Sequence, residues 1–148
     1  MSSLALLGLA EEVIGIDSSL EMLRRAKKTE HIHYLASSAE EPPFSNGSFD
    51  LVAACGSIDW VVRARFLPRV WELLADGGWL VPLDFGNTGS SREIPSLEIW
   101  YNDVFLRAYP RPPSIDPMIG AEEAEHYGFS EPGARQICLP LFIQRAAV

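Results

Sequence analysis

Short apolar runs alternate along the first half of the chain with segments whose apolar positions follow helical spacing. Residues 13–16 (Val-Ile-Gly-Ile) form a largely β-branched run that ends at Asp17, which is typical of a buried strand. Ser18 follows, and Glu21 lies three positions later, a spacing that predicts a capping box at the start of a helix. The pattern therefore predicts a strand, an acidic residue and a helix over residues 13–28.

Residues 31–35 alternate between polar and apolar, and residues 49–55 and 79–85 are mostly apolar. All three segments predict strands. Pro82 removes a backbone donor from the last of them, so we expect an irregularity there. Apolar strands that alternate with helices are typical of a parallel sheet covered on both faces. The chain is therefore predicted to be an α/β protein.

A helix predicted over residues 66–75 separates the last two of these strands, because its apolar residues recur at helical spacing. Pro68 lies within it, and proline is acceptable only in the first turn of a helix. The Asp-Gly-Gly sequence of residues 76–78 is expected to end the helix, with a glycine in the left-handed conformation.

The pattern changes after Gly86. A helix is predicted over residues 97–108, a short helix over residues 121–127 and a last strand over residues 134–142. Four prolines within residues 109–120 exclude regular structure there.

Length and charge narrow the possible partners. A chain of 148 residues suits one domain, and a formal net charge of -8 argues against nucleic acid, since phosphate backbones bind clustered cations. Cys55 and Cys138 lack metal-binding spacing and are expected to be reduced thiols in an intracellular, cytoplasmic protein. The apolar run at residues 4–10 is too short to cross a membrane and lacks the basic residues of a signal peptide. We therefore expect no membrane partner either.

Asp17 is the first candidate for chemistry. Ligands of open α/β sheets bind beyond the carboxyl ends of the strands, where an acid can accept both hydroxyls of a ribose. The alternative is an aspartate that caps the following helix or is only solvated. His31 and His33 would share one face of a strand as a possible metal pair, but no third ligand is apparent, which favours solvated histidines.

Four segments, in order and at matching spacing, resemble the class I S-adenosylmethionine-dependent methyltransferases, particularly their type 11 group. They are residues 13–18 with 21–23, residues 38–44, residues 47–52 and residues 73–80. The resemblance extends over residues 4–85 and implies a Rossmann-like three-layer αβα sandwich with a mostly parallel sheet. A nicotinamide-binding oxidoreductase would also use an acid such as Asp17, but it does not account for the last two segments.

The resemblance implies that S-adenosylmethionine is the cofactor and that residues 1–86 form its binding half, with residues 87–148 on the substrate side. Asp17 would bind the ribose hydroxyls. Family members often carry an acid where Ser38 stands, which accepts from the adenine amino group, and a neutral hydroxyl accepts more weakly. The other implied contacts are Ser18, Met22, Ser38 and Ala39 with the adenine, and Cys55 and Gly56 with the methionine portion and the transferring methyl.

The implied reaction is methyl transfer to a small-molecule acceptor. A sulfonium methyl is already activated, so positioning the acceptor supplies much of the acceleration, and a base is needed only where the acceptor loses a proton. Asp59, after the third strand, is the one candidate base, although an aspartate there could also cap the next helix. Trp60 could form a wall of the pocket, with plain packing as the alternative.

The family also has a strand and a glycine-rich turn before the residues that match 2–10, whereas here Met1 stands where the glycines should have just ended. We therefore expect a chain that lacks the usual first strand and is truncated at its start and short at its end. The strands at Val13 and Phe49 would then lack a partner between them. Either they pair directly, or the chain is a fragment, or another chain supplies a strand through exposed sheet edges, with residues 4–9 as a less favoured replacement. A cofactor-free remnant acting as an interaction module is the alternative function.

Overall fold

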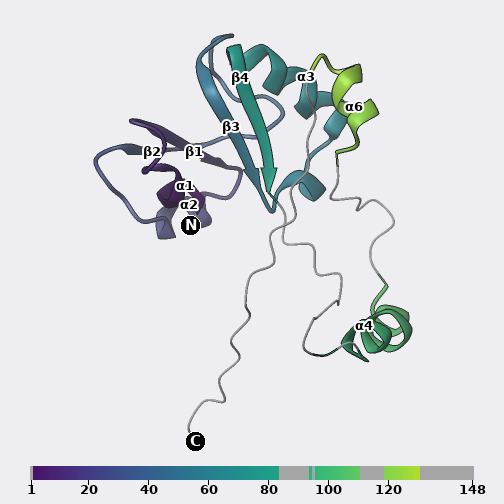
Figure 1. The fold of residues 1–148 in the computed structure, drawn as a ribbon. Helices are drawn as coiled ribbons and strands as arrows, with labels where there is room; N and C mark the ends of the chain where they lie inside the picture. Colours follow the sequence, from purple (N-terminus) through teal and green to yellow (C-terminus); the bar gives the residue numbers. More distant parts are fainter. Residues whose placement is uncertain (1, 84–93, 95, 111–118, 131–148) are drawn as a thin grey trace, which may run out of the picture.

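Two parallel strand pairs organise the protein. The computed structural model describes residues 2–83, 94, 96–110 and 119–130. In it β1 (Val13–Asp17) pairs with β2 (Ile32–Ala36), and β3 (Phe49–Cys55) pairs with β4 (Leu74–Leu83), each in parallel (Figure 1). The strands fall where the sequence predicts them, although β4 begins earlier.

Within the described residues, β1 and β3 are not hydrogen-bonded to each other, so the direct pairing considered above is wrong. The replacement strand at residues 4–9 is wrong as well. That segment begins as a helix, α1 (Ser2–Leu6), which contacts β1. Its leucines and alanine are not branched at Cβ, which favours a helix over a strand.

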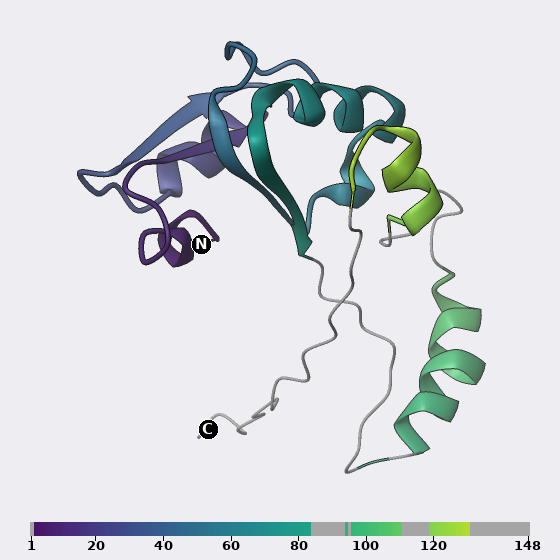
Figure 2. The same ribbon diagram turned by 45° about the horizontal axis from the view of Figure 1, so that its top comes forward.

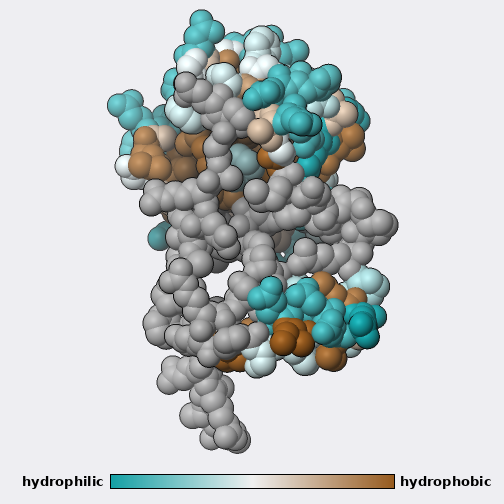
Figure 3. Space-filling view, turned by 45° about the vertical axis from the view of Figure 1, so that its right-hand side comes forward, coloured by the Kyte–Doolittle hydropathy of each residue, from teal (hydrophilic) through white to brown (hydrophobic). Residues whose placement is uncertain are grey.

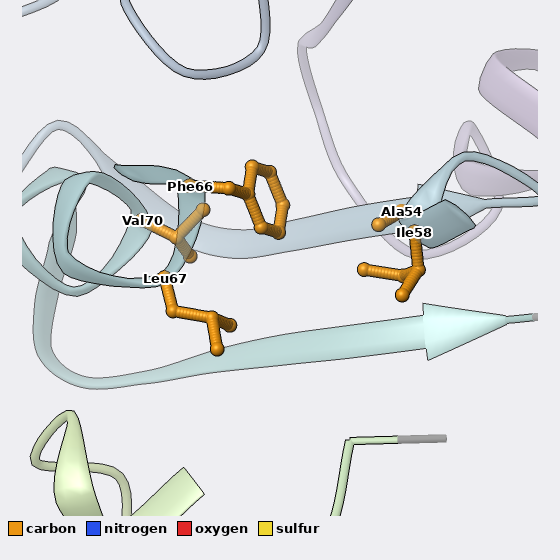
Figure 4. Packing of buried hydrophobic residues seen from close by; sticks show 5 residues of the cluster. All are labelled: Ala54, Ile58, Phe66, Leu67 and Val70. Atoms are coloured by element: carbon orange, nitrogen blue, oxygen red, sulfur yellow. The ribbon is translucent and has the colours of Figure 1, made fainter. Parts of the chain in front are cut away.

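The main hydrophobic core lies between α3 (Arg63–Leu73) and the β3–β4 pair. Leu67 is fully buried and Val70 is 1% exposed. Figure 4 shows how these side chains point from the helix toward the strand pair. The cluster consists of Ala54, Ile58, Phe66, Leu67 and Val70.

Helix α3 begins earlier than the sequence predicts, because the Val62 carbonyl accepts from the Arg65 and Phe66 N–H groups, both at 2.9 Å. Pro68 therefore lies beyond the first turn, against our expectation, and one helical hydrogen bond is lost there. The burial of the neighbouring side chains offsets this loss, since each buried large apolar side chain contributes about 1.5–3 kcal/mol.

The expected irregularity at Pro82 is also wrong. Pro82 pairs in register with Ala54, and the register shifts instead between Phe49 and Leu51, where β4 carries extra residues. β4 has only one strand neighbour among the described residues, and such an edge tolerates proline. The extra residues include Gly77, whose φ of 79° is left-handed as predicted, but the glycine lies in this bulge and does not cap α3.

The shorter helix α2 (Leu20–Arg25) follows β1 and contacts both β1 and β2. Its N-cap is Ser19, whose hydroxyl accepts from the Met22 N–H at 3.3 Å, and not Ser18 as the capping-box spacing predicts. The predicted helix is therefore displaced by one residue at its start.

Two helical regions lie further along the chain. The helix α6 (Ala121–His126) lies beside α3, and Arg63 forms an ion pair with Glu123 at 3.0 Å (Figure 2). Residues 96–108 form one helix with a π-helical middle, made of α4 (Ser96–Trp100), η2 (Tyr101–Phe105) and α5 (Leu106–Ala108).

The 96–108 helix stands apart from the strand pairs, and Figure 3 shows hydrophobic side chains at its surface. None of its residues is buried, and Trp100 is 49% exposed. No helix in the parts of the chain that the structure covers has the length and hydropathy needed to cross a bilayer. The strand predicted over residues 134–142 lies outside the described residues.

Candidate functional site

A cavity of about 610 Å³ lies between the two strand pairs. β1 and β3 both line it, together with the loops that follow β1, β2 and β3. The carboxyl ends of parallel strands are where ligands of α/β proteins bind. Of the residues singled out from the sequence, the cavity brings together Asp17, Ser18, Ser38, Ala39, Cys55 and Gly56.

Asp17 is the last residue of β1, and only one of its two carboxylate oxygens accepts a hydrogen bond within the described structure. Oδ1 accepts from the Ser19 N–H at 2.8 Å at the start of α2. No hydrogen bond to Oδ2 is found among the described residues, so this oxygen is available to a ligand. Asp17 thus accepts a hydrogen bond at the start of α2 and lines the cavity at the same time, whereas the N-cap of that helix is Ser19.

The loop after β2 supplies three polar side chains to the cavity, those of Ser37, Ser38 and Glu40. The Ser37 hydroxyl donates to the Ser38 carbonyl oxygen at 3.1 Å. The Ser38 hydroxyl donates to Oε2 of Glu40 and accepts from the Glu40 N–H at 3.2 Å. Oε1 of Glu40 accepts from the Val62 N–H at 3.0 Å, which ties this loop to the start of α3.

The hydrogen bond from Ser38, followed by that from the Val62 N–H, holds the pKa of Glu40 below its usual value. Glu40 is therefore a carboxylate at neutral pH and can only accept hydrogen bonds. Glu40 is not among the site residues that the sequence predicts. The signal was present, because a serine two residues before a glutamate can form a local turn of this kind.

The turn after β3 closes the cavity at Cys55 and Gly56. Gly56 has a φ of 59°, a left-handed conformation that disfavours other residues. Its N–H donates to the Leu83 carbonyl oxygen at 2.7 Å, so the ends of β3 and β4 are fixed together. The turn after β3 is therefore held against the end of β4.

Two predicted residues do not line the cavity. Met22 is 58% exposed on α2. Asp59 lies in a 3-10 helix (Ile58–Trp60), and its Oδ1 is buried without a hydrogen-bond partner in the described structure. Asp59 does not cap α3 either, because the N-cap there is Val62. Its neighbour Trp60 does line the cavity and is 86% exposed, so plain packing does not describe it.

His31 and His33 both donate to Glu12, at 3.1 Å to Oε1 and 3.2 Å to Oε2. The hydrogen bond from His31 is the largest cause that lowers the pKa of Glu12. All three side chains are more than half exposed. Within the described ranges no group of three or more potential ligands could hold a metal ion.

A larger cavity of about 780 Å³ lies between β4, α3 and α6. It is lined by residues such as Trp71 and Phe129 and by none of the residues predicted to bind the cofactor. Size alone would favour it, but convergent polar groups at strand ends are the better sign of a binding site. We therefore take the cavity between the strand pairs as the candidate site.

The residues at this site fit a nucleoside cofactor. The cavity runs along β1 and β3, and its end near Asp17, Ser38 and Gly56 is the part where polar groups meet. The unpaired Oδ2 of Asp17 suits a ribose hydroxyl, and the serine hydroxyls suit a heterocyclic base. Apolar residues of β3, including Leu51 and Val52, supply the remaining wall.

The parallel strand pairs with helices against them, and the polar groups gathered at the strand ends, define a Rossmann-like α/β protein of the class I methyltransferase type. The family described as "Methyltransferase domain" matches residues 1–81, more than half of the chain. The chain belongs to this family of S-adenosylmethionine-dependent methyltransferases.

Individual relatives agree with this assignment. Over 76 residues, which are 51% of this chain, the sequence is 29% identical to a Dictyostelium discoideum protein named "Putative methyltransferase". The fold is similar to a solved structure titled "The Structure of a Putative Type II Methyltransferase from Anaeromyxobacter dehalogenans", with a TM-score of 0.65, 20% identity and 75% of this chain covered. The chain spans 29% of the length of the first relative and 48% of the second.

Proposed function

We propose that this chain binds S-adenosylmethionine in the cavity between its strand pairs and takes part in methyl transfer to a small-molecule acceptor. The single observation that supports this is the convergence on one cavity of Asp17 from β1, Ser38 and Ala39 from the loop after β2, and Cys55 and Gly56 from the turn after β3. These positions come from three separate segments of the chain and meet at this site.

In this proposal Asp17 accepts from the ribose hydroxyls through the oxygen that Ser19 leaves free. Ser18, Ser38 and Ala39 contact the adenine, and Met22, which lies on α2 outside the cavity lining, would have to approach the cavity to do the same. Cys55 and Gly56 lie against the methionine portion. The cofactor supplies an activated sulfonium methyl, so the main task of the protein is to orient the acceptor and exclude water.

The acceptor would bind on the other side of the cofactor. Residues 1–86 would hold the cofactor, and residues 87–148 would contact the acceptor, as one cytoplasmic domain without a nucleic-acid or membrane partner. Asp59 would act as a general base only for an acceptor that loses a proton, and it would have to approach the cavity to do so. The exposed edges of the strand pairs would also allow a homo-oligomer.

Isothermal titration calorimetry with S-adenosylhomocysteine tests the proposal. We expect saturable heat for the whole chain, and a loss of affinity of about 10–100-fold in Asp17→Ala, because hydrogen bonds to a charged group contribute about 1.5–3 kcal/mol. Asp50→Ala is the matched control, since Asp50 is an exposed aspartate at the start of β3 that does not line the cavity.

No heat and no thermal shift at millimolar ligand would overturn the proposal. That result would leave the alternative function, a methyltransferase-like chain that acts as an interaction module without a cofactor. Equal binding by wild type and Asp17→Ala would place the ligand elsewhere on the protein.

A further inference from the structure

The arrangement of Ser38 and Glu40 restricts what the loop after β2 can offer a ligand. A serine hydroxyl has one donor hydrogen and two acceptor lone pairs. The hydrogen of Ser38 is given to Glu40 Oε2, and one lone pair accepts from the Glu40 N–H. One lone pair remains, so Ser38 can only accept from a ligand.

The direction of this hydrogen bond is fixed by charge. Glu40 is ionised at neutral pH and has no hydrogen to donate, so the shared hydrogen must come from Ser38. The opposite arrangement, in which Ser38 turns its hydrogen toward the cavity, would leave Oε2 without a donor. Val62 holds the other carboxylate oxygen, at 3.0 Å, and this keeps the side chain in place.

Ser37 strengthens the same restriction. Its hydroxyl hydrogen is given to the Ser38 carbonyl oxygen at 3.1 Å, so it too has only lone pairs left for the cavity. Ser37, Ser38 and Glu40 all line the cavity. A ligand that reaches this loop therefore meets hydroxyl and carboxylate oxygens that accept and do not donate.

On the basis of the proposed function, we infer that Glu40 is a positioning residue that makes Ser38 an obligatory acceptor, and that the site thereby selects a 6-amino purine over a 6-oxo purine. A 6-amino group donates to Ser38, whereas a 6-oxo group would face oxygens with no hydrogen to offer. A hydroxyl that donates to a carboxylate is also a stronger acceptor, which compensates for the neutral serine.

A comparison of the affinities for two nucleosides tests this inference. Calorimetry on the whole chain would compare S-adenosylhomocysteine with its 6-oxo analogue, S-inosylhomocysteine. We expect the wild type to prefer the adenosyl compound by about tenfold, the effect of one hydrogen bond made or left unsatisfied. In Glu40→Ala the hydroxyl can rotate to donate, and the preference should fall to about twofold or less.

A rescue variant separates positioning from a structural effect of Glu40, because an acid at position 38 accepts without help. Ser38→Asp combined with Glu40→Ala should regain a preference of about tenfold or more. Glu41→Ala is the matched control, since Glu41 pairs with Arg65 and does not line the cavity, and it should keep the wild-type preference.

The outcomes are distinguishable. Binding of both nucleosides with equal affinity by the wild type would contradict the inference and leave the proposed function standing. An unchanged preference in Glu40→Ala, or no recovery in the double variant, would also contradict it. Failure of the wild type to bind either nucleoside would overturn the proposed function and this inference together.

Discussion

The two strand pairs of this protein differ in how they are held. The β3–β4 pair packs against α3, and the side chains between them include Leu67 and Val70, which are almost fully buried. In the β1–β2 pair only Val13 and Ile32 are buried, and α2 contributes no buried residue. The polar groups of the candidate site, Asp17 among them, come mostly from this less packed pair.

The two strand pairs therefore have different roles. The β3–β4 pair with α3 supplies stability and an apolar wall, whereas the β1–β2 pair and its loops supply the groups that recognise a ligand. Regions with few buried contacts open more easily than the core. A ligand bound between the pairs would therefore order the β1–β2 side more than the β3–β4 side.

The largest expected change in the free energy of unfolding comes from a substitution in the core between α3 and the β3–β4 pair. Leu67→Ala should lower the free energy of unfolding by about 2–5 kcal/mol, because it removes a fully buried side chain and leaves a cavity. Chemical denaturation measures the change. Leu20→Ala in α2, where the side chain is 58% exposed, is the control and should change it by less than about 0.5 kcal/mol. Equal losses in the two variants would remove the contrast between the pairs.

A smaller effect is expected within the β1–β2 pair. A Cβ atom at Gly15 would lie 2.8 Å from ring carbons of Tyr34, its partner in β2. Gly15→Ala should therefore cost about 1–3 kcal/mol of unfolding free energy, the usual range for overpacking. Thermal or chemical unfolding measures it, with Gly8→Ala as control because nothing lies within 4 Å of that position.

Removal of the Tyr34 ring should recover part of the stability that Gly15→Ala loses. We expect Gly15→Ala combined with Tyr34→Val to lose less stability than the sum of the two single changes, since the clash is then absent. Additive losses would show that Tyr34 does not crowd Gly15 in solution.

The smallest expected effect concerns the loop after β2. Because the pKa of Glu40 is lowered in the folded state, its contribution to stability is complete above the usual pKa of 4.5 and is lost as pH falls through the lowered value. NMR titration of the Glu40 carboxyl carbon should show this low pKa. In Ser38→Ala the pKa should rise toward the usual value, and no change on this substitution would contradict the hydrogen bond on which the base selectivity depends.

Strong local patterns in the sequence predict much of the fold correctly. The segments that become β1, β2 and β3 are found almost at their observed bounds, because apolar runs at β1 and β3 and polar–apolar alternation at β2 are clear strand signals. The sequence does not predict the start of α3. The N-cap there is Val62, whose carbonyl accepts the first helical hydrogen bonds but whose side chain cannot cap the helix. The strand irregularity is placed at Pro82 and found elsewhere, because an edge strand accommodates a proline that an interior strand does not.

The candidate site is predicted in part. Asp17, Ser38 and Gly56 lie at strand ends, a position that the alternation of strands and helices already implies. The Ser38–Glu40 turn has a local signal in the serine two residues before the glutamate, whereas the contact from Val62 to Glu40 and the place of Trp60 at the cavity depend on the fold. Asp59 follows the expected strand, but it does not line the cavity, and its Oδ1 is buried without a hydrogen-bond partner among the described residues.

The central claim is that one ligand lies between the two strand pairs and contacts both. Two-dimensional NMR of the isotope-labelled chain, titrated with S-adenosylhomocysteine, tests it most directly. The account predicts that amide signals near Asp17, near Ser38 and near Gly56 shift together with one saturation curve. Shifts confined to one strand pair, or centred on Trp71 and the larger cavity, would contradict it.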